Sequence, residues 1–385
     1  MNFPLEGVTV LDFTQLLSGP LATLRLADLG ARIIKVEHKD KGDLSRSLYG
    51  ESVELCGDSA FFQAINRNKE SLELNLKDPQ SLEFVYQLVQ QVDVVTHNFR
   101  PGVMQRLGLD YEILKQHNPK LIYASVSGYG ADGPLASKPG QDLLVQAMSA
   151  FVWQSGNDED GPVPVGLALA DMFAGGQLVQ GILAALVSGE STEVEVSMLE
   201  AMLDFQFEPL TLFYQDGGQP VVRGDVNGAH PLVAAPYGLY QTQNGFMVLA
   251  MGSISKLAEL LESDALAQFD DPTQWYPQRD KVKQVLKNLL LTNTTQHWLS
   301  ILEPADIWCA EVLDWQQMLQ HDGFKVLDML QTVECGNGQM YQTTRCPIRI
   351  DGEVFKSEVG APVLGQHNHL LQQEFSYKLE SNYEQ

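Results

Sequence analysis

Buried strands and amphipathic helices alternate along the first half of the chain. The apolar run VTVLDF (residues 8–13) predicts a buried strand, LATLRLADLGA (21–31) an amphipathic helix, and RIIKVE (32–37) a second strand. Gly19 and Pro20 form the turn between the first strand and the helix, and Gly30 is well placed to end the helix. This strand–helix–strand unit predicts two parallel neighbouring strands.

The same alternation continues to about residue 130. Further strands are predicted at SLELNL (71–76), DVVTHNF (93–99) and KLIYASVSGYG (120–130), with a helix opened by Asp78-Pro79 and a short one at Tyr111 to Lys115. Repetition of this kind predicts an α/β fold, with an open parallel sheet covered by helices.

The second half of the chain has a different pattern of predicted secondary structure. Helices are predicted from Asp171 through MFAGGQLVQGILAALV and at MLEAMLDFQF, and a Gly-, Pro- and Asn-rich stretch after Gln215 resembles a linker. Asn244-Gly245 predicts a hairpin, MYQTT and IRI predict antiparallel strands, and a last helix is expected near 370–375. The predicted organisation is a large α/β domain at 1–216, a small α+β domain at 217–325, and a tail at 326–385 that completes the large domain.

Composition and charge narrow the function. The 385 residues carry a net charge of -24, which argues against nucleic-acid binding, since a duplex needs a basic face. The first residues predict no signal peptide, and no uninterrupted apolar run approaches the length of a membrane span. Four cysteines are scattered at 56, 309, 335 and 346 without metal-ligand spacing, a usage typical of a reducing compartment. We expect a cytoplasmic protein without a bound metal or prosthetic group.

Polar loops follow the predicted strands, where parallel sheets bind ligands. The first loop, TQLLSGP, lacks GxGxxG, which disfavours a nicotinamide oxidoreductase, although Glu37 resembles a ribose-binding acid. Basic side chains gather in these loops, and Phe99 could stack on a flat ring. They are Lys39, Lys41, Lys77, Arg100, Arg106 and Lys138. Each alone could be solvated surface charge; together they favour a phosphate-bearing, nucleotide-like ligand.

Asp171 is the candidate reactive group. Asp is a favoured helix N-cap, and capping alone would explain it. Its neighbours GLALA and MFAGG are small and apolar, so its carboxylate would be poorly solvated, which strengthens an anionic nucleophile. Gly175 and Gly176 leave room for a bulky ligand. The pattern leaves both readings open.

Four ordered blocks resemble the class III CoA-transferases (CaiB/BaiF type), the family of formyl-CoA transferase, carnitine CoA-transferase and 2-methylacyl-CoA racemase. The blocks are PLEGVTVLDFTQLLSGPLATLRLADLGARIIKVE, HNFRPGVMQRLGLDYE, SGYGADGPLASKPGQD and ALADMFAGGQLVQGILAAL. IWCAEV and the tail GAPVLGQHNHLL also resemble the family.

The resemblance implies a Rossmann-like large domain whose parallel sheet is formed by both chain ends, a smaller inserted domain and an interlocked homodimer. It places the nucleophile on Asp171 and implies coenzyme A or acyl-CoA as substrate. The implied CoA contacts are Leu17, Ser18, His38, Lys39, Leu74, Asn75, Leu76, Lys77, Asn98, Phe99, Arg100, Arg106, Lys138, Gly140 and Gln141.

Departures from the family pattern bear on the reaction. His38 stands where transferases often carry Arg, and the basic turn after the long helix is shortened to SGEST. Gln141 replaces the racemase His, and Ser255 aligns with the racemase's second acid. Racemisation needs a base on each face of the carbon, so the sequence disfavours it.

The sequence therefore predicts transfer of CoA from an acyl-CoA thioester to a small carboxylic acid through a covalent intermediate on Asp171. An acyl-CoA isomerase or lyase on the same scaffold, and a catalytically silent CoA-binding protein, remain as alternatives.

Overall fold

The computed structural model describes residues 3–48 and 54–382, and the chain forms two compact units. Unit 1 comprises Met1–Val145, Ala168–Phe205 and Asp328–Gln385, and unit 2 comprises Gln146–Leu167 and Gln206–Leu327. Residues 146–167 and 206–216, expected in the large domain, thus belong to unit 2. Local apolar patterns predict helices but not the unit against which each helix packs.

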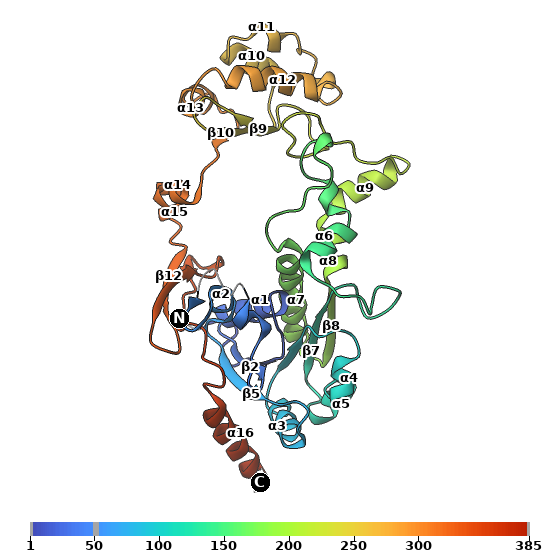
Figure 1. Ribbon diagram of the computed structural model, residues 1–385, viewed down its shortest axis with the longest axis vertical. Helices are drawn as coiled ribbons and strands as arrows, with labels where there is room; N and C mark the ends of the chain where they lie inside the picture. Colours follow the sequence, from blue (N-terminus) through green and yellow to red (C-terminus); the bar gives the residue numbers. More distant parts are fainter. Residues whose placement is uncertain (1–2, 49–53, 383–385) are drawn as a thin grey trace. The chain divides into compact units, whose positions relative to one another are not determined.

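The main sheet of unit 1 is parallel throughout and has the strand order β5-β2-β1-β6-β7-β8 (Figure 1). Its strands are β1 (Thr9–Asp12), β2 (Arg32–His38), β5 (Glu70–Leu74), β6 (Val94–His97), β7 (Ile122–Ser127) and β8 (Thr192–Ser197). The order changes direction around β1, where chain crossovers diverge and ligand crevices form. All six strands lie between Thr9 and Ser197, and none of the carboxyl-terminal strands joins this sheet, which corrects the expectation that both chain ends form it.

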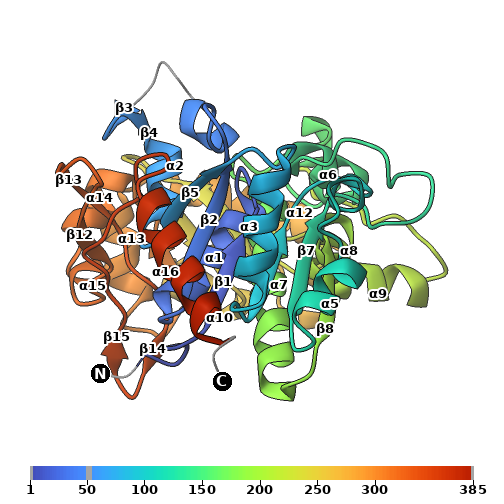
Figure 2. The same cartoon turned by 90° about the horizontal axis from the view of Figure 1, so that it is seen from below.

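Helices cover both faces of this sheet (Figure 2). They are α1 (Ser18–Asp28), α2 (Ala60–Asn66), α3 (Pro79–Val89), α4 (Val103–Leu107), α5 (Tyr111–His117), α6 (Asp142–Met148), α7 (Leu169–Ser188), α8 (Met198–Phe205) and α16 (Asn368–Asn382). α6 extends past Val145 into the segment assigned to unit 2. The chain's end contributes α16, whose Leu371 and Phe375 lie in one apolar core with Val36, Leu72 and Leu88. A helix rather than a strand therefore completes the layer over β2 and β5.

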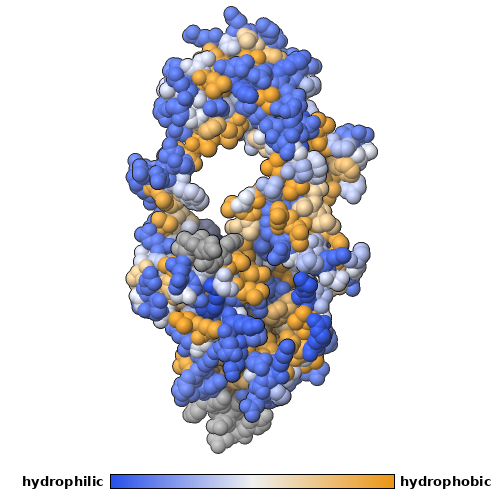
Figure 3. Space-filling view, in the orientation of Figure 1, coloured by the Kyte–Doolittle hydropathy of each residue, from blue (hydrophilic) through white to orange (hydrophobic). Residues whose placement is uncertain are grey.

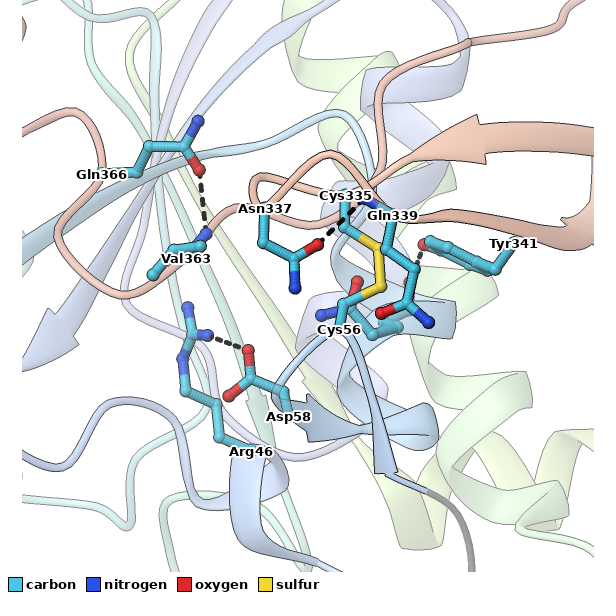
Figure 4. Close-up of a disulfide and its surroundings, with 10 residues drawn as sticks. Arg46, Cys56, Asp58, Cys335, Asn337, Gln339, Tyr341, Val363 and Gln366 are labelled. Atoms are coloured by element: carbon cyan, nitrogen blue, oxygen red, sulfur yellow. Dashed lines mark hydrogen bonds and ion pairs between the residues drawn. A yellow bond between two sulfur atoms is a disulfide. The ribbon is translucent and has the colours of Figure 1, made fainter.

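Two cysteines far apart in the sequence are joined. Cys56, between β3 (Glu54–Leu55) and β4 (Asp58–Ser59), forms a disulfide with Cys335, which follows β12 (Leu330–Glu334) (Figure 4). Tyr341 on β13 (Met340–Thr344) also donates a hydrogen bond to the carbonyl of Gln63, 2.8 Å away. The spacing of the cysteines indicated no such pair, because 279 positions separate them. Cys309 and Cys346 are free thiols.

Unit 2 has its own core under a small antiparallel sheet of β9 (Gly238–Gln241), β10 (Phe246–Leu249) and β11 (Cys309–Glu311). The predicted hairpin is confirmed, since β9 and β10 pair across Asn244-Gly245. Its helices are α9 (Phe207–Gln215), α10 (Ile254–Leu260), α11 (Asp264–Ala267), α12 (Arg279–Leu290), α13 (Thr295–Leu302), α14 (Trp315–Gln320) and α15 (Asp322–Lys325). The short hairpin β14 (Arg349–Ile350) and β15 (Glu353–Val354) belongs to unit 1.

Candidate active site

The carboxyl ends of the parallel strands gather nearly all the predicted binding residues. In sheet order, β5 leads to Leu74–Lys77, β2 to His38 and Lys39, β1 to Leu17 and Ser18, β6 to Asn98–Arg100, and β7 to the loop 128–141. Direct contacts join neighbouring loops: the Lys39 amide donates to the Leu74 carbonyl over 3.1 Å. The topology therefore places these segments side by side along one edge of the sheet.

Six cations at this edge are exposed, and we call them the rim cations. They are Lys39, Lys41, Lys77, Arg100, Arg106 and Lys138. None of them forms an ion pair within the part of the chain that the structure describes. On a chain with a net charge of -24, unpaired cations at a sheet edge are suited to an anionic ligand. His38 is also exposed, and its Nδ1 lies 2.5 Å from the Lys39 carbonyl.

Other predicted binding residues shape the backbone instead. The Asn98 amide group accepts a hydrogen bond from the Gln15 amide (2.8 Å) and donates one to the Gln15 carbonyl (2.7 Å). A Cβ on Gly140 would lie 2.5 Å from the Cα of Gly128, so only glycines allow the two ends of the 128–140 loop to touch. Gln141 follows this contact and is exposed.

The residues of the loop after β5, and Phe99, differ in how far they are buried. Leu74 is buried, and Leu76 and Phe99 pack against the core of unit 1 while remaining partly exposed. Asn75 is exposed, and its carboxamide oxygen accepts a hydrogen bond from the Lys77 amide, 3.1 Å away. Beside Phe99 and Arg100 lies a cavity of about 550 Å³ with Tyr111 and Tyr129 in its walls. Its walls can accommodate a flat ring next to the rim cations.

Glu37, the candidate ribose acid, is already engaged. Its carboxylate accepts hydrogen bonds from Arg46 (both oxygens, 2.7 Å) and Ser71 (2.6 Å), and it is buried. A ligand hydroxyl has no access to it, which removes the remaining sign of a dinucleotide site.

Asp171 lies in the first turn of α7, three residues after the N-cap Ala168. It does not cap the helix: Asp142 does, because its carboxylate accepts hydrogen bonds from the amides of Ala170 (2.6 Å) and Asp171 (3.2 Å). The capping explanation for Asp171 is therefore wrong. Its carboxylate is left for other contacts, near the positive end of the helix dipole.

The start of α1 supplies those contacts. The Ser18 amide and hydroxyl lie near the Asp171 carboxylate and favour its ionised form. The helices can approach because residue 175 is glycine: a Cβ there would lie 2.6 Å from the Ser18 carbonyl oxygen. Burial raises the pKa of Asp171 to about 6 and the Asp142 carboxylate adds to the rise, whereas the Ser18 hydroxyl and amide lower it. Asp171 is thus a weakly solvated carboxylate that is mostly ionised at neutral pH.

A buried ionic cluster of Asp12, Lys35, Asp43 and Lys69 lies under the loop between β1 and α1. Lys35 pairs with Asp43 over 2.7 Å and Lys69 with Asp12 over 3.3 Å, with the side chains of both pairs wholly buried. Burial lowers the pKa of Lys69 to about 8, although the nearby Asp12 opposes this. The two positive and two negative charges cancel, so the buried cluster carries no net charge.

Sequence reasoning identified Asp171 and Ser18 as site residues. It missed that Asp142 caps the helix of Asp171 and that Asp43 binds the loop before Ser18. Asp142 directly precedes an apolar helical stretch, which is an N-cap signal, but it caps a different helix 28 residues later. No local pattern reports a contact at that distance.

In unit 2, His230 accepts a hydrogen bond at Nδ1 from the Leu232 amide (3.3 Å), as a turn histidine does. Among the described residues, α7 is long and apolar enough to cross a membrane by length and composition alone. The expectation concerned uninterrupted apolar runs, and Asp171, Gln177 and Gln180 interrupt this helix. α7 also packs against α1, α8, β7 and β8, as a helix of a folded core does.

Exposed cations on the rim of a parallel α/β unit suit an anionic ligand, and a shielded carboxylate at a helix start suits carboxyl chemistry. The chain belongs to CoA-transferase family III, which it matches over residues 5–368, and it is a transferase.

Named relatives agree with this assignment. The chain is 35% identical to acetyl-CoA:oxalate CoA-transferase of Acetobacter aceti, over 97% of this chain and 96% of that protein. It is 31% identical to succinate–glutarate CoA-transferase of Agrobacterium fabrum, with 94% of each chain covered. Its fold resembles that of a CAIB/BAIF family protein from Brucella suis, with a TM-score of 0.83, 28% identity, and 97% of this chain and 100% of that chain covered.

Proposed function

We propose that this protein moves CoA from an acyl-CoA thioester to a small dicarboxylic acid through covalent intermediates on Asp171. The observation that carries the proposal is the Asp171 carboxylate, which lies near the Ser18 amide and hydroxyl, is weakly solvated, and belongs to the same unit as the rim cations. The relatives' names include oxalate, succinate, glutarate and mesaconate, and this supports a dicarboxylate as acceptor or donor.

The chemistry follows from a carboxylate nucleophile. An Asp171 oxygen attacks the thioester carbonyl and the carbon–sulfur bond breaks, giving a mixed anhydride and CoA thiolate. The thiolate attacks the aspartyl carbonyl, releasing the donor acid and leaving an aspartyl-CoA thioester. The acceptor carboxylate displaces the thiolate to form a second anhydride, and the thiolate attacks the acceptor's carbonyl to give the new acyl-CoA and free Asp171. No net proton or electron is exchanged.

The residues of unit 1 would serve these steps in different ways. The rim cations would hold the phosphates of CoA, and Phe99 with the neighbouring cavity would hold the adenine ring. Amides at the start of α1 and α7 would stabilise the oxyanions. His38 leaves one phosphate position with a weaker cation than Arg, which Lys39 would supplement.

The test has two parts. Purified protein is assayed with acetyl-, formyl- and succinyl-CoA against oxalate, succinate, glutarate and mesaconate, and new thioesters are detected by mass spectrometry. We expect turnover with at least one dicarboxylate. Asp171→Asn is expected to lower it by at least ~10³-fold while CoA binding, measured by calorimetry, stays within a few-fold. Near-normal turnover by this variant would rule out the mechanism.

We also propose that the active form is a cytoplasmic homodimer. α9 has no buried residue although it carries Phe207, Leu210, Phe213 and Tyr214, and apolar surface also lies around α6 and α8 (Figure 3). A second copy of the chain would cover such a surface. Sedimentation at micromolar concentration should give twice the mass of 42.7 kDa; a monomer would contradict the proposal, and cell fractionation tests the location.

A further inference from the structure

The loop that carries Ser18 has an uncommon backbone. Leu16 has a φ of 65°, in the left-handed region that a side chain with a Cβ disfavours. Leu17 precedes α1 as its N-cap without a side-chain cap bond. Something outside the loop must hold this conformation, because its own sequence does not favour it.

The buried ionic cluster grips the loop at successive residues. Asp12 accepts hydrogen bonds from the Thr14 amide (2.9 Å) and hydroxyl (2.5 Å), and Lys35 donates to the Thr14 carbonyl (2.8 Å). Asp43 accepts a hydrogen bond from the amide of Leu16, 3.1 Å away. Asn98 fixes both backbone groups of Gln15, as described above. The backbone is thus bound by side chains at each residue from 14 to 16.

Asp43 is the member of the cluster that acts at the left-handed residue. One carboxylate oxygen accepts from Leu16 and Ser45, and the other pairs with Lys35, so the carboxylate cannot rotate without breaking a buried contact. Beyond Leu16 the chain turns directly into α1, whose first residue, Ser18, packs against α7 at Gly175 and places its amide and hydroxyl near the Asp171 carboxylate.

We propose that Asp43, anchored by Lys35, is a positioning residue that holds Leu16 in its left-handed conformation and thereby aims the Ser18 amide and hydroxyl at Asp171. This deepens the proposed function and rests on it for its catalytic meaning. The cluster acts on the nucleophile through the backbone rather than by touching substrate.

The surroundings of Asp171 make the effect measurable. The charged group that faces it is Asp142 on α6, α1 presents Ser18, and Glu200 on α8 accepts a hydrogen bond from Ser197 instead. The nearby Ser18 amide and hydroxyl favour the ionised carboxylate, so moving them away should make Asp171 harder to ionise.

The experiment titrates the Asp171 carboxyl by carbon NMR of protein labelled at aspartate carboxyls, with the signal assigned by its absence in Asp171→Asn. Asp43→Asn removes the anchor but leaves Lys35 without its partner. Leu16→Pro is the second variant: proline forbids a positive φ and lacks the amide donor, while the ion pairs stay intact. Both variants should raise the titration midpoint by about one pH unit, the equivalent of one hydrogen bond to a charged group.

Two matched controls separate positioning from general damage. Leu16→Gly keeps the amide and favours the left-handed conformation, and Asp28→Asn breaks a buried pair with Arg67 elsewhere in unit 1. Neither should move the midpoint. An unchanged midpoint in Leu16→Pro, or an equal rise in Asp28→Asn, would overturn the proposal, and a folded Asp43→Asn without the rise would do the same.

The titration needs no substrate, so it stands apart from the proposed function. If Asp171→Asn kept full transfer activity, the mechanism would fail while the titration still decided whether Asp43 positions Ser18. If the proposed mechanism and the positioning role both hold, the acidic limb of the pH profile of kcat/KM shifts to higher pH in Leu16→Pro, by the same amount as the NMR midpoint.

Discussion

The buried ionic cluster and the rim cations lie in the same unit, yet they differ in everything that surrounds them. Lys35 and Lys69 have no solvent access, and each is paired with an aspartate and bonded to backbone carbonyls. Lys77 and Arg100 are exposed and have no ion-pair partner among the described residues. A cation whose hydrogen bonds are used up inside the fold fixes the backbone, whereas an unpaired one is available to a ligand. Substitutions in the two sets should therefore affect different quantities.

The largest effect is expected in the cluster. Asp12→Asn leaves Lys69 without its charged partner in a dry interior, and should lower the free energy of unfolding of unit 1 by about 3–5 kcal/mol. All five tryptophans lie in unit 2. Hydrogen exchange of β1 and β2 peptides therefore reports unit 1, and tryptophan fluorescence serves as the internal control. A loss below about 1 kcal/mol would mean that the cluster is not a structural charge network.

The disulfide supports the same region, because the β3–β4 hairpin carries Asp58, which pairs with Arg46 over 2.6 Å. Replacing Cys56 with Ser releases a link that spans 279 positions and should cost about 2–4 kcal/mol in unit 1. Thermal unfolding with and without reductant measures this. Reductant should reduce the stability of the wild type to that of Cys56→Ser and leave the variant unchanged; an effect on both would point to another cause.

On the rim, the effect should appear in binding. Lys77→Ala should raise the KM for acyl-CoA by about tenfold, an effect that shrinks as salt is added, and leave stability within about 0.5 kcal/mol. Lys120→Ala is the matched control, since Lys120 is equally exposed but precedes β7 at the opposite edge of the sheet. Equal changes in KM for the two variants would show that the rim is ordinary surface.

The smallest effect is expected in the pH dependence of stability, to which Asp171 and Asp12 contribute with opposite sign. Lys69 and Lys35 hold the pKa of Asp12 below its usual value despite burial, so Asp12 stabilises the fold above the unfolded pKa, and this is lost as pH falls through the folded value. The pKa of Asp171 is raised to about 6, so between 3.8 and 6 the folded state binds the extra proton and stability falls as pH rises. Asp171→Asn should therefore stabilise unit 1 by on the order of 1 kcal/mol at pH 8 and by nothing at pH 3.5. Destabilisation at pH 8 would contradict the claim that burying the ionised Asp171 carboxylate lowers the stability of unit 1.

Sequence patterns predicted much of the fold because strands and helices of unit 1 are encoded locally. The strands at 8–13 and 32–37 and the Asp78 cap of α3 are examples, the last confirmed by its 3.0 Å bond from Ser81. Contacts at long range were not predictable: Asp142 capping α7, Cys56 joining Cys335, and the absence of the carboxyl-terminal strands from the main sheet all depend on packing. The same holds within the site. Asp171 stands out by its apolar neighbours, but Asp43 reads as an ordinary loop acid until the fold places it on the amide of Leu16.

The most direct measurement asks whether Asp171 becomes acylated during turnover. The protein is mixed with an acyl-CoA donor and quenched with hydroxylamine, and the peptide that contains residue 171 is sequenced by mass spectrometry. We expect a hydroxamate on Asp171 that requires the donor and disappears when an acceptor acid consumes the intermediate before the quench. Transfer that proceeds with residue 171 unmodified, or with the hydroxamate on a different carboxylate, would contradict the assignment of Asp171 as the nucleophile.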